Sequence, residues 1–119
     1  MEWILVAALN LTGVMITHGG CEPHVRGWQH EDLIFLCDDD PVVLRHESIH
    51  VIQHNLGRNI LSQDTLSSQA AKLPDGDILF IISHYHPDNI EAELEARVLQ
   101  DVPSPILAFG ILTSHYFGP

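Results

Sequence analysis

The chain has 119 residues, of which 45% are hydrophobic, and this composition predicts a single globular domain with a modest core. There are 16 acidic and 5 basic residues, which gives a formal net charge of -11 with histidine neutral. An acidic surface repels the phosphates of nucleic acids, so we expect no DNA or RNA partner. Histidine is frequent, and His46, His50 and His54 recur at four-residue spacing.

An apolar segment, residues 3–16, lies near the start of the chain and is typical of either a strand or a buried helix. An export signal would normally begin with basic residues, whereas Glu2 is the only early charge, so we interpret the segment as part of the core. It is too short for a transmembrane helix, and we expect no membrane association. A polar loop is expected over residues 18–30.

Two cysteines, Cys21 and Cys37, permit at most one disulfide within the chain. An exported protein would be expected to form that bond, whereas a cytoplasmic protein would more often keep two buried thiols. The sequence leaves both states open.

The next part of the chain is predicted to place a strand before a capped helix. Residues 33–37 form a short apolar run, which indicates a strand. Asp40 is a favourable N-cap, and Pro41 suits the first helical position. Gly57 is placed to end the helix, which we therefore expect over residues 41–55.

The second half of the chain is predicted to contain further helices and a second strand. Residues 58–72 are expected to form a helix or an irregular segment, and residues 74–77 a turn. The clearest strand of the chain is expected at 78–82, followed by a loop at 84–87. A helix is expected from Asp88 to about Val102, where Pro103 ends it, and the type of the last segment, 106–117, is undecided. The order strand, helix, strand, helix predicts one small α+β domain over residues 1–119.

The predicted helix over residues 41–55 carries the motif His46-Glu47-Ser48-Ile49-His50. Residues four apart lie on one face of an α-helix, so His46 and His50 can present two imidazoles to one tetrahedral zinc ion. Glu47 is rotated by one position, which suits a general base that acts on a zinc-bound water without binding the metal. The alternative is a structural helix with incidental histidines, but burying such groups without partners would be costly.

A catalytic zinc site usually has a third protein ligand. His54 continues the row, but three turns of a straight helix cannot converge on one metal, so we expect it at the surface or behind the ligands. The acidic helix downstream offers three candidates, Glu91, Glu93 and Glu95. Its apolar stripe is flanked about equally by Glu91 and Glu93, whereas Glu95 points furthest away and is expected to be solvated. Glu91 also stands three residues after Asp88, where a capping-box Glu belongs.

The motif at His46, taken with the downstream segment Glu93-Leu94-Glu95-Ala96, resembles the gluzincin metallopeptidases. The short single-domain minigluzincins are similar in size, and the residues around the motif also resemble small phage and cyanobacterial zincin-like proteins. The resemblance covers residues 33–99. It implies a small zincin-like fold, in which a short sheet packs on the motif helix and on a second, Glu-bearing helix, and it implies that Glu93 is the third zinc ligand.

Two positions set this chain apart from related patterns. Many gluzincins place an Asp four residues after the ligand Glu to orient a zinc histidine, and this chain has Arg97 there. The metzincin pattern would need Gly and His further along the motif helix, where this chain has Gln53 and Leu56, so that class is excluded.

Gluzincins commonly bind the reaction's oxyanion with Tyr or His, so the tripeptide His84-Tyr85-His86 contains candidate stabilisers, Tyr85 and His86. The alternative is an ordinary polar loop, and His115-Tyr116 is a second possible source. The family also offers a strand edge near the motif to extended substrate, so residues 33–37 are either a substrate-binding edge or an ordinary core strand. The other histidines lack partner spacing and are expected to be exposed: His18, His24 and His30.

The expected function is hydrolysis of a peptide or protein substrate by a zinc-dependent metallopeptidase. The alternative is a zincin scaffold that serves, with or without zinc, as a non-catalytic binding or structural protein, for example in a virion. The intact Glu47 favours the enzyme, because a structural zinc site does not need a base, whereas the small size favours the scaffold. A small acidic inhibitor without zinc is a third possibility. We expect a soluble protein, cytoplasmic or virion-associated rather than exported.

Overall fold

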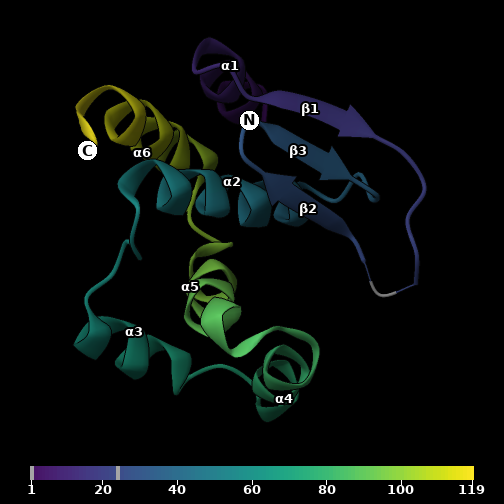
Figure 1. The fold of residues 1–119 in the computed structure, drawn as a ribbon, viewed down its shortest axis with the longest axis vertical. Coiled ribbons are helices and arrows are strands. Elements are labelled where there is room, and N and C mark those ends of the chain that lie inside the picture. Colours follow the sequence, from purple (N-terminus) through teal and green to yellow (C-terminus); the bar gives the residue numbers. More distant parts are fainter. Residues whose placement is uncertain (1, 24) are drawn as a thin grey trace.

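The computed structural model describes residues 2–23 and 25–119, and its elements can be followed in Figure 1. In chain order they are α1 (Glu2–Leu11), β1 (Met15–His18), β2 (Gly27–His30), β3 (Leu33–Leu36), α2 (Pro41–Leu56), α3 (Gln63–Ala70), α4 (Asp75–His84), the 3-10 turn η1 (Pro87–Asn89), α5 (Ile90–Leu99) and α6 (Ser104–Phe117). The helices and one three-stranded mixed sheet form a single α+β domain, as predicted at the level of α+β class.

The strand that precedes the motif helix is the central strand of the sheet. β3 pairs in parallel with β1, with Met15 opposite Leu33, and antiparallel with β2, with Gly27 opposite Leu36. Both sides of β3 are therefore occupied by hydrogen bonds to its neighbours. Of the two alternatives for residues 33–37, the structure favours the ordinary core strand, and the free edges of the described sheet belong to β1 and β2.

The motif helix α2 runs through the middle of the molecule. It contacts α6 and α1, the strands β2 and β3, and α5, so other elements pack along several of its faces (Figure 1). The core includes fully buried side chains from the helices and the sheet, among them Leu5, Leu9, Ile34, Ile49 and Ile111. Because α2 is packed in this way, the side chains it carries have fixed positions.

The ends of α2 lie where the sequence predicts them. Asp40 Oδ1 accepts a hydrogen bond from the backbone N–H of Val42 at 2.9 Å, and Pro41 is the first helical residue. At the other end, Gly57 adopts a φ of 67° and donates its N–H to the carbonyl oxygen of Gln53 at 2.9 Å. These caps fix the length of the helix that carries the motif.

The clearest predicted strand is wrong, because residues 78–82 lie in helix α4. The segment pairs with no strand, and a helix satisfies backbone N–H and C=O groups within itself. Pro74, interpreted as part of a turn, precedes the helix, and Asp75 and Asp77 occupy its first turn, where acidic side chains are favourable. Within α4 only Ile81 is buried, so the apolar run forms a surface helix.

The first part of the chain contains more elements than predicted. Residues 3–16 are not one element, because α1 ends at Leu11 and Gly13, with a φ of 85°, turns the chain toward β1. The expected loop over residues 18–30 contains β2, which is short and lacks a strong apolar pattern.

The later elements differ from the predictions mainly at their boundaries. Residues 58–72 contain the short helix α3, and residues 106–117 belong to α6. The helix expected from Asp88 begins instead after the turn η1, and α5 ends at Leu99. The side chain of His86, not that of Asp88, provides the cap at this point, because it accepts a hydrogen bond from the Asp88 N–H.

Cys21, in the loop after β1, forms a disulfide with Cys37 at the end of β3, and their Cα atoms lie 5.5 Å apart. The bond closes the segment that contains β2. Of the two states that the sequence leaves open for these cysteines, the structure has the disulfide. Among the described residues, no helix has both the length and the apolar character needed to cross a membrane.

Candidate metal centre

The two motif histidines on α2 and one glutamate on α5 meet at a single point. His46 Nε2 lies 3.0 Å from Glu93 Oε2, and His50 Nε2 lies 2.9 Å from Glu93 Oε1. Two ligands of a tetrahedral zinc ion are about 3.3 Å apart, which is close to these spacings. The three ligand atoms lie within 4.8 Å of one another, so these residues form a group that could hold a metal ion.

The side chain of Gln53 fixes the ring of His50. Gln53 Nε2 donates to the backbone oxygen of Ala92 at 3.1 Å and to Glu95 Oε1 at 3.0 Å, which determines the orientation of the amide. The amide oxygen lies 2.7 Å from His50 Nδ1, so this ring nitrogen carries the proton and donates it. In the neutral ring, the lone pair therefore lies on Nε2, on the side of Glu93.

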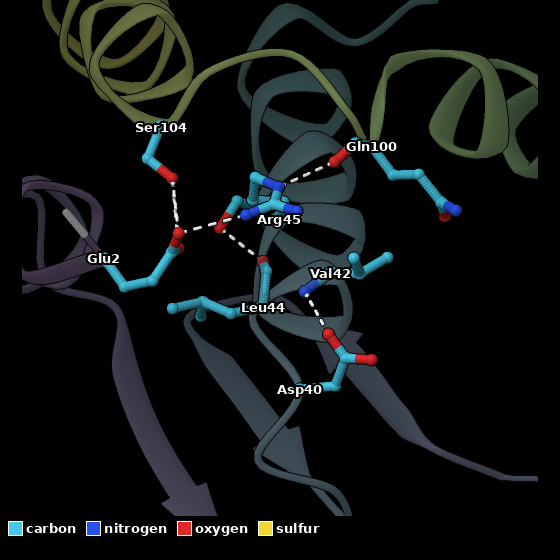
Figure 2. A network of polar contacts seen from close by, with 8 residues as sticks. Glu2, Asp40, Val42, Leu44, Arg45, Gln100 and Ser104 are labelled. Carbon is cyan, nitrogen blue, oxygen red and sulfur yellow. Dashed lines mark hydrogen bonds and ion pairs between the residues drawn. The ribbon is translucent and has the colours of Figure 1, made fainter.

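A second glutamine orients His46. His46 Nδ1 lies 3.0 Å from Gln100 Oε1, just after α5. Arg45 holds the backbone at this point, because its Nε donates to the Gln100 carbonyl oxygen at 2.7 Å while its Nη1 contacts Glu2 at 3.0 Å. Figure 2 shows the contacts of Arg45 with Glu2 and with the Gln100 carbonyl oxygen, and the Gln100 side chain extending away from Arg45. Two amides thus orient the motif histidines, and the Asp that the gluzincin resemblance would place at position 97 is replaced by Arg97.

The environment of His50 Nε2 shows that the group formed by His46, His50 and Glu93 suits a cation. The atom is buried and has no hydrogen-bond partner among the described residues, yet Glu93 Oε1 lies only 2.9 Å away. A ring lone pair and a carboxylate oxygen repel at this distance unless a proton or a metal ion lies between them. The donor set, two imidazoles and one carboxylate, fits zinc.

The pKa values of the same residues show how strongly the group attracts positive charge. Burial alone would lower the pKa of His50, but the contacts with Glu93 outweigh it and raise that pKa to about 9. Burial would raise the pKa of Glu93, but its contacts with His46 and His50 lower it to about 2. The metal-free group therefore holds a proton in the place that a cation would take.

Glu47 lies beside this group without a structural partner. It is 6% exposed, and its side chain makes no hydrogen bond or ion pair with any described residue. Burial raises its pKa, while His50 and His46 oppose that shift. β2 approaches α2 closely here, because a Cβ atom at Gly27 would lie 2.8 Å from Val43 Cγ1. The structure thus buries a carboxylate beside the ligand group without a hydrogen bond or an ion pair to any described residue.

A cavity of about 390 Å³ opens beside His46 and Glu47, a volume within the usual range of ligand sites. Its walls come from β2 and the residues before it, from α2, from α4 and the residue after it, and from α5 and the residue after it. The lining residues are Val25, Arg26, Gly27, Trp28, Val42, Val43, His46, Glu47, Phe80, Tyr85, Arg97 and Gln100. The wrongly predicted strand thus contributes Phe80 to the site.

Of the two candidate oxyanion stabilisers, Tyr85 lines the cavity and His86 does not. Burial, with the charges of Glu93 and Glu47, raises the pKa of Tyr85 to about 12, so its phenol stays protonated and can donate a hydrogen bond. The exposed ring of His86 instead accepts a hydrogen bond from the Asp88 N–H at 3.2 Å.

Comparison with family models, with curated proteins and with solved structures found no match. The interpretation of this site therefore rests on the geometry of the chain itself. That geometry comprises converging ligand atoms, amides that fix the rings, a buried carboxylate and an adjoining cavity.

The two other glutamates of α5 do not have the roles expected from the sequence. Glu95 was expected to be solvated, but it is fully buried. Its two carboxylate oxygens accept hydrogen bonds from the backbone N–H groups of Ile60 and Leu61, each at 2.7 Å, as well as the bond from Gln53. Glu95 therefore supports the His50 ring through Gln53 and also anchors the loop after α2.

Glu91 does not cap the helix, because α5 begins only after η1. It accepts hydrogen bonds from the side chains of Asn59 at 3.2 Å and Gln63 at 3.0 Å. It thus joins α5 to α3 at the surface, away from the ligand group.

The other histidines do not join the described metal-ligand group. His54 is exposed, and so are His18 and His30, whereas His24 lies outside the described residues. The ring of His84 stacks on Phe80, and His115 contacts Tyr116 on α6.

Sequence reasoning missed the two glutamines and the wall formed by β2. A local signal existed for Gln53, because it follows His50 by three residues and therefore shares its helix face. Gln100 and the wall residues Gly27 and Trp28 reach the site through tertiary packing, which no local pattern reveals.

Glu95→Ala is expected to lower the free energy of unfolding by about 3 to 5 kcal/mol, because it leaves buried donors without their acceptor. Glu95→Gln keeps the size and one acceptor, so its loss should be smaller, about 1 to 3 kcal/mol. Urea unfolding followed by circular dichroism measures both. Glu91→Ala is the matched control on the same helix and should change stability by about 0.5 kcal/mol or less. Equal stability of the Glu95→Ala and Glu91→Ala proteins would contradict the structural role of Glu95.

Proposed function

We propose that this chain is a small zinc-dependent peptidase. The observation that carries the proposal is the convergence of His46, His50 and Glu93 next to Glu47, a buried carboxylate at a cavity. Metal ligands alone would also suit a structural site. A second carboxylate without a structural partner, beside a space for substrate, favours catalysis.

Each residue of the site has a role in this proposal. His46, His50 and Glu93 hold the zinc, with their rings oriented by Gln53 and Gln100 as described above. Bound zinc would lower the pKa of water toward neutrality and polarise a carbonyl group. Glu47 accepts the proton of the attacking water and passes it to the leaving amine. The Tyr85 phenol donates a hydrogen bond to the oxygen that becomes negatively charged.

The position of the sheet beside the cavity favours a peptide as the substrate. β2 is an edge strand, and Gly27 and Trp28 from its first half line the cavity next to Glu47. An extended peptide can add to such an edge through backbone hydrogen bonds, while the cavity receives one of its side chains. We place on β2 the substrate-binding edge that the sequence leaves open as one of two alternatives for residues 33–37.

The proposal is tested by metal analysis and peptide cleavage on the same preparation. Protein purified without added zinc should contain close to one zinc per chain by mass spectrometry of the metal. It should cleave members of a mixed-sequence peptide library, detected by mass spectrometry of the products. Removal of the metal with a chelator should stop cleavage, and stoichiometric zinc should restore it.

The outcomes separate the functions considered from the sequence. Stoichiometric zinc with restorable cleavage supports the peptidase. Stoichiometric zinc without any cleavage contradicts the peptidase and leaves a zinc-containing scaffold. Absence of zinc, with no binding when zinc is added, contradicts the peptidase and leaves a scaffold that works without zinc or the small acidic inhibitor.

A further inference from the structure

The cavity beside the ligand group carries a large share of the chain's positive charge. Two of the 5 basic residues, Arg26 and Arg97, line it. Although the chain has 16 acidic residues, Glu47 is the one carboxylate among the described residues of the lining. Whether either guanidinium can bind a negatively charged group depends on how its donors are already used.

The two arginines differ in how their donors are used. Arg26 is engaged by two carboxylates, because it donates to Asp38 at 3.1 Å and to Asp40 at 3.0 Å. Arg97 has only an ion pair of 3.8 Å between its Nη1 and Asp77, which is too long for a hydrogen bond. Its Nε is buried and has no partner among the described residues. The guanidinium of Arg97, with five N–H donors, is therefore the group with unused capacity.

Arg97 lies close to the residues that the proposed function places at the reaction. It follows Glu93 by four residues on α5, so the two side chains lie on the same face, one turn apart. Tyr85 lines the same cavity and lies near both residues. A peptide whose scissile bond lies at Glu47 thus has its neighbouring residues within reach of Arg97.

On the basis of the proposed peptidase function, we propose that Arg97 binds a carboxylate of the peptide substrate close to the scissile bond. A planar guanidinium matches a carboxylate with two parallel hydrogen bonds, a geometry that a carbonyl group does not offer. The carboxylate is either the C-terminus of a short peptide or an Asp or Glu side chain. The apolar walls at Trp28 and Phe80 receive the adjacent part of the peptide.

Binding and cleavage are measured with paired peptides. One set of labelled hexapeptides of Ala and Leu carries a single Asp at each position in turn, and a matched set carries Asn. Each peptide is made with a free and with an amidated C-terminus. Fluorescence anisotropy gives affinities for the metal-free and the zinc-loaded protein, and product analysis gives kcat/KM. We expect the preferred carboxylate peptide to exceed its neutral match by about 10- to 100-fold in both measurements.

Variants assign this preference to one residue. Arg97→Gln should abolish the preference, and Arg97→Lys, which keeps the charge without the planar fork, should reduce it. Asp77→Asn removes the one carboxylate that contacts Arg97 and should strengthen binding of the carboxylate peptide. Arg58→Gln is the matched control, because it removes one positive charge at an exposed position outside the cavity, and it should keep the preference.

The outcomes decide the inference separately from the proposed function. Equal binding of the acidic and neutral peptides by the unmodified protein would overturn it, and so would a preference that survives in folded Arg97→Gln. If Arg97→Gln does not fold, an unchanged preference in Arg97→Lys overturns it and a reduced one supports it. A carboxylate preference in binding without any cleavage would contradict the peptidase but support the site. Cleavage without any carboxylate preference would support the peptidase but contradict the carboxylate site.

Discussion

Glu93→Ala is expected to lower zinc affinity by more than about 100-fold, the upper end of the effect of losing a residue that only orients a ligand. The reason is that Glu93 is the single carboxylate that contacts both motif histidines, through Nε2 atoms at 3.0 and 2.9 Å. Without it, two imidazoles remain, which is one protein ligand fewer than a catalytic zinc site usually has. Competition with a chromophoric chelator measures the affinity.

The control for this change is Glu91→Ala on the same helix. Glu91 contacts Asn59 and Gln63 at the surface, so its loss should leave zinc affinity within about threefold of the unmodified protein, the range of context effects expected for a surface substitution. His46→Ala and His50→Ala should match Glu93→Ala. Full retention of zinc in Glu93→Ala would remove Glu93 from the site and with it the basis of the gluzincin resemblance.

The motif helix could be predicted because its determinants are local. Asp40, Pro41 and Gly57 define the ends of α2 through contacts with their own neighbours. His46, Glu47 and His50 then share or adjoin one face because of helical periodicity alone. The choice of Glu93 agreed with the structure, but one step in its support failed, because Glu91 is not a capping residue.

The features that could not be predicted depend on tertiary contacts between segments that are far apart in the sequence. The apolar run at residues 78–82 suits a buried strand or a helix, and only the absence of a strand beside it decides for the helix. Glu95 was assigned to solvent from the stripe of α5, but the N–H groups of Ile60 and Leu61 supply it with donors from another segment. The role proposed for Arg97 could not be predicted either, because its N–H donors without partners among the described residues and its place in the cavity lining depend on the tertiary structure.

Glu47→Gln is expected to retain zinc and to lower kcat for peptide cleavage by roughly 10²- to 10⁴-fold, the range that a general base contributes. Glutamine keeps the size of the side chain, so the cavity and the ligand group should keep their shape. What it loses is the ability to accept a proton from the attacking water, a step that no other carboxylate lining the described cavity can perform.

Stability provides the second measurement on the same variant. A carboxylate that stabilised the fold would make thermal unfolding easier when replaced, but Glu47 is buried and makes no hydrogen bond or ion pair with a described residue. Burying a neutral amide costs less than burying a charge, so Glu47→Gln should unfold at the same or a higher temperature than the unmodified protein. Glu22→Gln, at an exposed position, controls for the change in net charge and should alter neither cleavage nor unfolding. Cleavage by Glu47→Gln at the unmodified rate, with zinc retained, would mean that Glu47 is not the base and that the catalytic interpretation of this site is wrong.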